Sequence, residues 1–229
     1  MKNLSLISIC LFLVATGLAQ TKSISLSDYS SLDAATGVSI ILHEGTPKAD
    51  IEVTKGDIED LVVEVKGSTL VIKFKNKVMS WNNGGNKARI DLYGKNLRRI
   101  EASAGANVES DYTLTAKKFT ADASSGASIS VDVECTTLDA EISSGASIVI
   151  EGTTDDLEVD ASSGASYNGI RMIAKDASAE ASSGASIKLW AKESIEANAS
   201  SGGSIKYKGD PTNKDISKDK WSGGSIKRM

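Results

Sequence analysis

The second half of the chain alternates between apolar and polar residues with a period of two. Just before Gly145, for example, Leu138 and Ala140 fall on one side of the chain, while Asp139 and Glu141 fall on the other. This is the spacing of a β-strand, in which successive side chains point to opposite faces. The pattern therefore predicts short strands that each have one apolar and one polar face.

A short phrase recurs seven times in this half, most often as Ser-Ser-Gly-Ala-Ser. Its glycines follow one another at intervals of 18 to 21 residues, and they are Gly105, Gly126, Gly145, Gly164, Gly184, Gly202 and Gly223. A period near 20 residues is typical of stacked repeats. Each unit then consists of a strand, a tight corner, a second strand and a return segment. The glycine supplies the positive φ that the corner needs.

Strands this short cannot bury a core alone, so each unit must stack on its neighbours through backbone hydrogen bonds. The sequence predicts an all-β fold, a parallel β-solenoid of about seven short coils that is roughly 30 Å long. The core column lies three residues after each glycine and comprises Val108, Ile129, Ile148, Tyr167, Ile187, Ile205 and Ile226. The slots three and five residues before the glycine hold mostly small apolar residues, so the core is thin at one corner.

A column of polar side chains is expected two residues after the glycine. It comprises Asn107, Ser128, Ser147, Ser166, Ser186, Ser204 and Ser225. Hydroxyls in such a column can hydrogen-bond along the stack or to the backbone of the corner, which gives them a structural role.

An acidic column is expected four residues before the glycine, on an outward face. It comprises Glu101, Asp122, Glu141, Asp160, Glu180 and Asp219, with Asn198 in the sixth coil. Carboxylates about 5 Å apart repel by roughly 1 kcal/mol per neighbouring pair even in water. Two interpretations stay open: a solvated face with loose counter-ions, or a surface that binds a cation or a cationic partner.

Four residues after the glycine, the side chain changes from acidic in the first coil to basic in the last coils. That slot holds Glu109 in the first coil and Lys188, Lys206 and Lys227 in the last three. The C-terminal coils are therefore basic on one face, a feature that is equally compatible with a role in solubility.

Residues 20–100 are β-rich but lack the short phrase, and they are expected to cover the open first coil of the solenoid at 101–229. The predicted strands are Val38–Glu44, Asp50–Lys55, Leu61–Lys66, Thr69–Lys75 and Ala88–Tyr93. Gly67 and Ser68 predict a hairpin turn between the third and fourth of these strands. The other end of the solenoid is expected to be closed by residues 207–229, with Trp221.

Residues 1–19 predict a signal peptide, because Lys2 precedes an apolar run that ends in Gly-Leu-Ala before Gln20. Cleavage after Ala19 leaves Cys135 as the single cysteine, so no disulfide forms within the mature chain. Export to the periplasm, the outer surface or the medium follows. No other apolar run approaches 18 residues, so no transmembrane segment is expected in the mature chain.

Charge and composition argue against several classes of function, namely nucleic-acid binding and chemistry that needs a cofactor or a metal. The formal net charge is −4 and acidic and basic residues are interspersed, so a nucleic-acid partner is not expected. The single histidine, His43, has no nucleophile motif beside it, and the acidic residues are spaced by whole coils instead of being grouped on one loop. We therefore expect neither a cofactor nor a resident metal.

The order of motifs resembles a known family. The N-terminal GVSIILHEG and LVVEVKGSTLVIKFK, the join ARIDLYGKNLRRIEASAGANV, the SSGAS phrases and the closing IKYKGDPTNKDISKDKWSGGSIKR are similar to the head GIN domain family of auto-transporter adhesins. The resemblance covers nearly the whole mature chain. It implies a right-handed parallel β-helix and a role in cell adhesion.

These observations favour an exported, non-catalytic binding module whose partner is a protein or a glycan. Carboxylate pairs such as Asp139/Glu141 suit a β-helix glycan lyase or hydrolase in principle, but they recur with the repeat, whereas an active site normally breaks it. The alternative of an envelope polysaccharide-binding protein depends on Trp81, in an Asn- and Gly-rich loop, and on Trp190, which is expected to point outward. Assembly into a homo-oligomer stays open.

Overall fold

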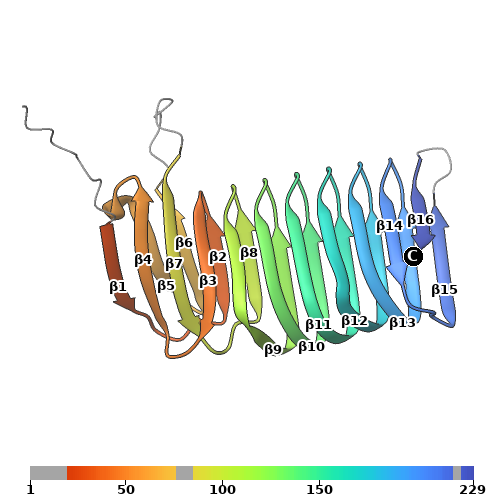
Figure 1. Cartoon of the computed structure of the whole chain (residues 1–229), viewed down its shortest axis with the longest axis horizontal. Coiled ribbons are helices and arrows are strands. Elements are labelled where there is room, and N and C mark those ends of the chain that lie inside the picture. The colour runs from red at the N-terminus through yellow and green to blue at the C-terminus, as the bar shows by residue number, and fades with distance from the viewer. Residues whose placement is uncertain (1–19, 76–84, 219–222) are drawn as a thin grey trace, which may run out of the picture.

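The computed structural model of the protein describes residues 20–75, 85–218 and 223–229. It confirms the predicted β-solenoid, whose coils lie side by side along the long axis of the molecule (Figure 1). All sixteen described strands belong to one continuous sheet. Across the described ranges there is no α-helix, and the single helical element is a 3-10 turn, Ile58–Asp60.

The strands of the N-terminal part are β1 (Gln20–Ser25), β2 (Ser31–Ala35), β3 (Val38–Glu44), β4 (Lys48–Lys55), β5 (Leu61–Lys66), β6 (Thr69–Phe74), β7 (Lys87–Gly94) and β8 (Arg99–Ser103). The later strands are β9 (Asn107–Ala123), β10 (Ser128–Ile142), β11 (Ser147–Ala161), β12 (Ser166–Ala181), β13 (Ser186–Ala199), β14 (Ser204–Lys208), β15 (Asn213–Lys218) and β16 (Ser225–Arg228). The five predicted N-terminal strands are present, and β1 and β2 are additional. The hairpin at Gly67 is confirmed by the antiparallel pairing of β5 with β6.

The repeat places equivalent residues of successive coils side by side. In the parallel pair β10–β11, for instance, Ile129 lies opposite Ile148 and Glu141 lies opposite Asp160. Residues at the predicted inward positions are buried, and Tyr167 of the core column is fully inaccessible to solvent. Burial of one apolar residue per slot in every coil is what drives the stacking.

The corners are tighter than the sequence suggested. In the corner of β10–β11, both Ser144 and Gly145 have positive φ, of 53° and 71°. The amide of Ala146 donates to the carbonyl of Ser143 at 3.1 Å, which closes a turn of type I′. The expectation that glycine alone adopts positive φ is therefore incomplete, because this turn type requires the left-handed conformation at both central residues. The amide of Gly145 also donates to the carbonyl of Ser163 in the next coil, at 3.1 Å.

The stacked coils extend into the N-terminal region. Strand β2 pairs in parallel with both β6 and β8, and β3 pairs in parallel with both β7 and β9. The corner between β2 and β3 also has two residues with positive φ, Thr36 at 63° and Gly37 at 70°. Residues 31–44 thus form an additional copy of the repeat, which sequence reasoning missed because Thr-Gly-Val stands where the other copies have Ser-Gly-Ala, Ser-Gly-Gly or Ala-Gly-Ala.

The N-terminal end of the stack is built from antiparallel strands. Strand β4 runs antiparallel to β7, β1 runs antiparallel to β4, and β5 runs antiparallel to β6. At the other end, β15 pairs with β13 and β16 pairs with β14. The predicted signal peptide, Trp221 and the loop that contains Trp81 lie outside the described residues. Among those that are described, no helix is long and apolar enough to cross a bilayer.

Candidate functional site

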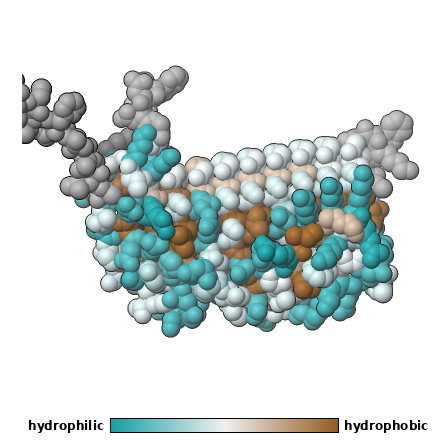
Figure 2. Space-filling model, viewed as in Figure 1, coloured by the Kyte–Doolittle hydropathy of each residue, from teal (hydrophilic) through white to brown (hydrophobic). Residues whose placement is uncertain are grey.

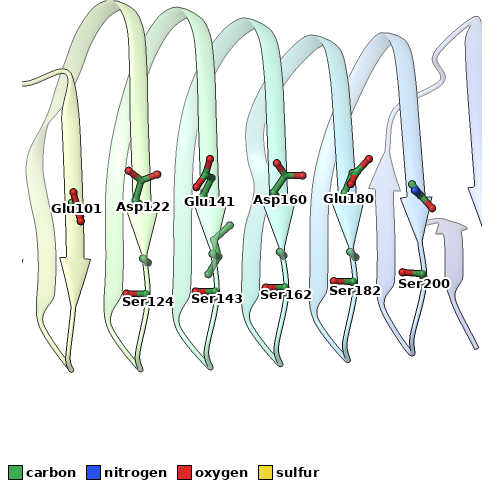
Figure 3. A pocket seen from close by; sticks show the side chains of 15 residues that line it. Glu101, Asp122, Ser124, Glu141, Ser143, Asp160, Ser162, Glu180, Ser182 and Ser200 are labelled. Carbon is green, nitrogen blue, oxygen red and sulfur yellow. The ribbon is translucent and has the colours of Figure 1, made fainter. Parts of the chain in front are cut away.

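The acidic column forms one wall of a groove that runs along the solenoid beside the corners (Figure 3). Five carboxylates line it, from Glu101 through Asp122, Glu141, Asp160 and Glu180, and each is the registered neighbour of the next. The groove has a volume of about 490 Å³.

Serine hydroxyls line the groove next to the corners. Each is the first serine of the repeated phrase, and the set is Ser124, Ser143, Ser162, Ser182 and Ser200. Figure 3 shows them as a second row parallel to the carboxylates. Four successive coils each contribute one carboxylate and one serine hydroxyl to the groove, about 4.8 Å from the next pair. In the coil that follows, Asn198 stands beside Ser200 in place of a carboxylate.

The column is one coil longer at its N-terminal end than the sequence indicated. Asp33 of β2 lies opposite Glu101 of β8, so it occupies the equivalent position in the additional coil. At the C-terminal end, Asn198 lies opposite Ser217 of β15, and the predicted member Asp219 is outside the described residues. The signal that could have identified Asp33 is the fragment Asp-Ala-Ala-Thr-Gly-Val-Ser-Ile, which keeps the spacing of the phrase.

One cation offsets the repulsion at the start of the column. The guanidinium of Arg99 contacts the carboxylate of Asp122 and lies 3.6 Å from that of Glu101. In the described part of the chain, Glu141, Asp160 and Glu180 have no ion pair. The groove therefore keeps an uncompensated negative charge along its middle and C-terminal coils.

Burial and the crowding of carboxylates in the groove raise the pKa of two of them. Burial raises the pKa of Asp122 above its ordinary value, Arg99 opposes the rise, and Glu141 and Glu101 add to it. Burial likewise raises the pKa of Asp160, with further increases from Glu180, Glu158 and Glu141. A cation placed in the groove would relieve this repulsion, because an opposite charge favours the ionised form.

The acidic residues of this face repeat from coil to coil. Among the described residues, no group of three or more His, Cys, Asp or Glu side chains is arranged to hold a metal ion. The pair Asp139/Glu141 recurs as Glu158/Asp160 in the next coil, where the equivalent residues are registered neighbours. Lys118 pairs with Asp139 at 2.5 Å, which gives that carboxylate a structural partner.

A second polar cluster lies on the other outer face, at the N-terminal coils. His43 of β3 contacts two carboxylates, with Nε2 at 3.1 Å from Asp91 and Nδ1 on Asp111, and its ring stacks on Tyr93. Partial burial lowers the pKa of His43, but the hydrogen bonds and charges of Asp91 and Asp111 raise it by more, so the pKa lies above its ordinary value. With a carboxylate on each ring nitrogen, the imidazolium joins β7, β3 and β9, and this geometry indicates a structural role.

Trp190 lies far along the same outer face, on β13, and points outward as predicted. The ammonium of Lys208 sits 3.8 Å from the centroid of the indole ring. Trp190 follows the corner of its coil, whereas the acidic residues precede theirs, so the structure does not bring the predicted aromatic and acidic groups together. Trp81 is outside the described residues.

Comparison with known proteins identifies the family of the chain. Residues 28–211 match the family profile described as "Putative auto-transporter adhesin, head GIN domain". Among proteins of curated function, none matches the sequence.

Several solved structures are similar to the chain. A "putative adhesin" from Bacteroides fragilis NCTC 9343 has a TM-score of 0.83 at 22% identity and covers 93% of this chain and 98% of its own. A "putative adhesin" from Parabacteroides merdae ATCC 43184 has a TM-score of 0.71 at 19% identity, with 93% and 97% covered. A "Putative lipid binding protein" from Parabacteroides distasonis ATCC 8503 has a TM-score of 0.68 at 19% identity, with 93% and 98% covered. At these identities the likeness shows a shared fold.

Proposed function

The chain belongs to the head GIN domain family, and from this premise we propose that it is an exported, non-catalytic binding module of the adhesin kind. Its acidic groove is the binding face, and the partner is a protein surface that presents lysine or arginine side chains. The family and the adhesin names of its structural neighbours support an adhesin-like role. The predicted signal peptide supports export to the cell envelope or beyond.

The observation that carries this proposal is the unbroken register of carboxylates along the groove. The carboxylates of Glu141, Asp160 and Glu180 lie in neighbouring coils and repel one another. In the described structure none of the three has an ion pair that would offset this repulsion. A cationic partner relieves that repulsion in every coil it contacts. Each exposed contact contributes only about 0.2 to 1 kcal/mol, so useful affinity depends on several coils acting together.

Binding fits the groove better than catalysis does. A catalytic site needs differentiated groups, such as an acid and a base whose pKa values are pushed apart. The groove repeats a carboxylate and a hydroxyl in four successive coils, and burial is the first cause of the raised pKa values of both Asp122 and Asp160. Repetition of this kind suits a ligand that is itself extended and multivalent.

The test is a binding screen of the chain from Gln20 onward against extracellular-matrix proteins and glycan arrays, with and without millimolar calcium. We expect saturable binding to a basic protein that is lost in the triple variant Glu141→Gln, Asp160→Asn, Glu180→Gln. The matched control Asp132→Asn, Glu134→Gln, Glu193→Gln removes the same charge from exposed positions elsewhere and should keep the binding. Equal loss in both variants would show a general charge effect, and turnover of any arrayed glycan would contradict the non-catalytic role.

A further inference from the structure

One row of outward side chains crosses the whole face on the other side of the corners, and its charge changes from acidic to basic along the solenoid. Strand pairing places these residues side by side in the order Ser23, Asp50, Asp91, Ile41, Glu109, Ser130, Val149, Asn168, Lys188, Lys206 and Lys227. All the acidic residues of the row lie in its N-terminal part, among Ser23 and Ile41, neutral residues fill the middle, and lysines occupy the last three coils. Figure 2 shows hydrophilic side chains projecting at the C-terminal end of the molecule, below the pale row of corners.

The three lysines form a ladder whose charge is not compensated. Lys188, Lys206 and Lys227 are all exposed, and their strands lie about 4.8 Å apart. No described carboxylate pairs with any of them. Like charges that face each other across neighbouring strands are destabilising, so the ladder is kept at a cost to the fold. An anion that spans two or three coils would remove that cost.

Aromatic and hydroxyl groups lie on the same strands. Trp190 follows Lys188 by two residues, which places it on the same face, and Lys208 lies opposite it and over its ring. Two residues before each lysine is a serine, and these are Ser186, Ser204 and Ser225. The last three coils therefore present, in adjacent rows, hydroxyls, ammonium groups and an indole.

We propose that this lysine ladder, Lys188, Lys206 and Lys227 with Trp190 beside it, is a second binding site and that its ligand is an anionic polysaccharide. Such a polymer carries a carboxylate or sulfate at regular intervals for the ammonium groups and hydroxyls for the serines. The apolar face of a sugar ring would pack against the part of the half-buried indole that Lys208 leaves exposed. A second copy of this chain would offer carboxylates through its groove but no sugar ring for the exposed part of the Trp190 indole. A lipid surface would engage the lysines but would not need their spacing to match the coils.

The site is independent of the acidic groove, because the two occupy strands on opposite sides of each corner. The protein could then hold an anionic polymer with one face and a basic protein with the other. This second site goes beyond the proposed function. Loss of binding at one face would leave binding at the other unaffected, so the two are tested separately.

The experiment measures binding of a heparin octasaccharide and of polygalacturonate to the chain from Gln20 onward, by calorimetry at several salt concentrations. Neutral dextran is the negative control. We expect the triple variant Lys188→Gln, Lys206→Gln, Lys227→Gln to bind roughly 30-fold more weakly at low salt, with the slope of log K against log salt reduced by about 2. Trp190→Ala should weaken binding about fivefold and leave that slope unchanged.

Matched controls separate the ladder from general charge. The variant Lys73→Gln, Lys95→Gln, Lys117→Gln removes three exposed lysines elsewhere and should change affinity by less than about twofold. The acidic-groove variant should bind the polyanions as the natural chain does. If the ladder variant shows no cooperative thermal unfolding and is therefore not folded, the single change Lys206→Gln takes its place and should weaken binding about threefold.

Three results would overturn the proposal. The first is unchanged polyanion affinity in the folded ladder variant. The second is binding to phosphatidylcholine vesicles that contain phosphatidylglycerol without binding to either polyanion, which would assign the lysines to a lipid surface. The third is self-association of the natural chain that the ladder variant loses while polyanion affinity is unchanged, which would assign them to a second copy.

Discussion

The two outer faces beside the corners are built from the same repeat, yet one is regular and the other is not. On the face that precedes the corners, Thr137–Ile142 of β10 pair residue for residue with Asp156–Ala161 of β11, and the carboxylates stay in line. On the face that follows them, the register shifts between Val149 and Glu151, and again between Asn168 and Ile173. A regular face repeats one kind of side chain from coil to coil, whereas an irregular face supports local clusters such as His43 with its two carboxylates.

Tyr167 gives a physical reason for the largest irregularity. It is the one aromatic residue in a core column of isoleucine and valine, and it is fully buried. The chain makes room at Gly169, where an added Cβ would lie 2.6 Å from Cε1 and 2.7 Å from Oη of the tyrosine. Across this segment β12 has one residue more than β11 and three more than β13, and these extra residues form the bulge that shifts the register.

The largest effect should come from filling this space. Gly169→Ala should destabilise the protein by about 2 kcal/mol, since overpacking of a full core forces side chains and backbone apart. Urea unfolding monitored by circular dichroism measures the change. Gly164→Ala, at a corner with φ of 71° but no atom within 4 Å of the added Cβ, should cost only about 1 kcal/mol. Equal costs at the two positions would mean that Tyr167 does not need the space at Gly169.

The His43 cluster should make the stability of the irregular face depend on pH. Because the pKa of His43 is raised in the folded state, its contribution is fully present below the ordinary value near 6.5 and is lost as pH rises through the raised value. His43→Gln should therefore cost about 1 kcal/mol at pH 5.5 and little at pH 9.

The measurement for His43 is the difference in unfolding free energy between variant and natural chain across this pH range. Taking the difference removes the contribution of the groove carboxylates, which both proteins share. A difference that does not vary with pH would show that the histidine is uncharged or unpaired.

On the regular face, neutralising one carboxylate should stabilise the fold. The raised pKa of Asp160 means that the folded state binds its proton more tightly, so its charge opposes folding at neutral pH and this penalty disappears as pH falls through that pKa. Asp160→Asn should raise Tm by about 2 °C at pH 7, and the gain should vanish near pH 3. Differential scanning calorimetry tests this, with Asp132→Asn as the control. A fall in Tm at pH 7 would show that Asp160 has a cationic partner.

The smallest effect should come from the corners that both faces share. Asparagine is favoured over serine before the glycine of a type I′ turn, where the residue must adopt positive φ. Ser144→Asn should therefore stabilise the protein by about 0.5 kcal/mol in chemical denaturation. Ser143→Asn, one position earlier and outside the left-handed region, should give no gain. A gain at Ser143 alone would contradict the assignment of the turn.

The fold could be predicted in outline because period-two alternation and a 20-residue repeat leave few alternatives. The same logic located the core column and an outward acidic column. It could not show that Asp33 extends that column, since a single degenerate copy of the phrase does not stand out without the pairing of β2 with β8. It also could not place His43 between Asp91 and Asp111, because the three residues come from strands that are adjacent only after folding. Long-range pairing is the information that a local pattern lacks.

The order of the first coils has a mechanical consequence. Because β2 and β3 are held on both edges by strands that come later in the chain, a pull on the N-terminal side first unzips β1 from β4 and then meets a coil secured on two sides. A pull on the C-terminal side instead peels β16 from β14 alone. The molecule should therefore yield at different forces from its two ends, and a tether near the N-terminus would keep it folded under greater tension.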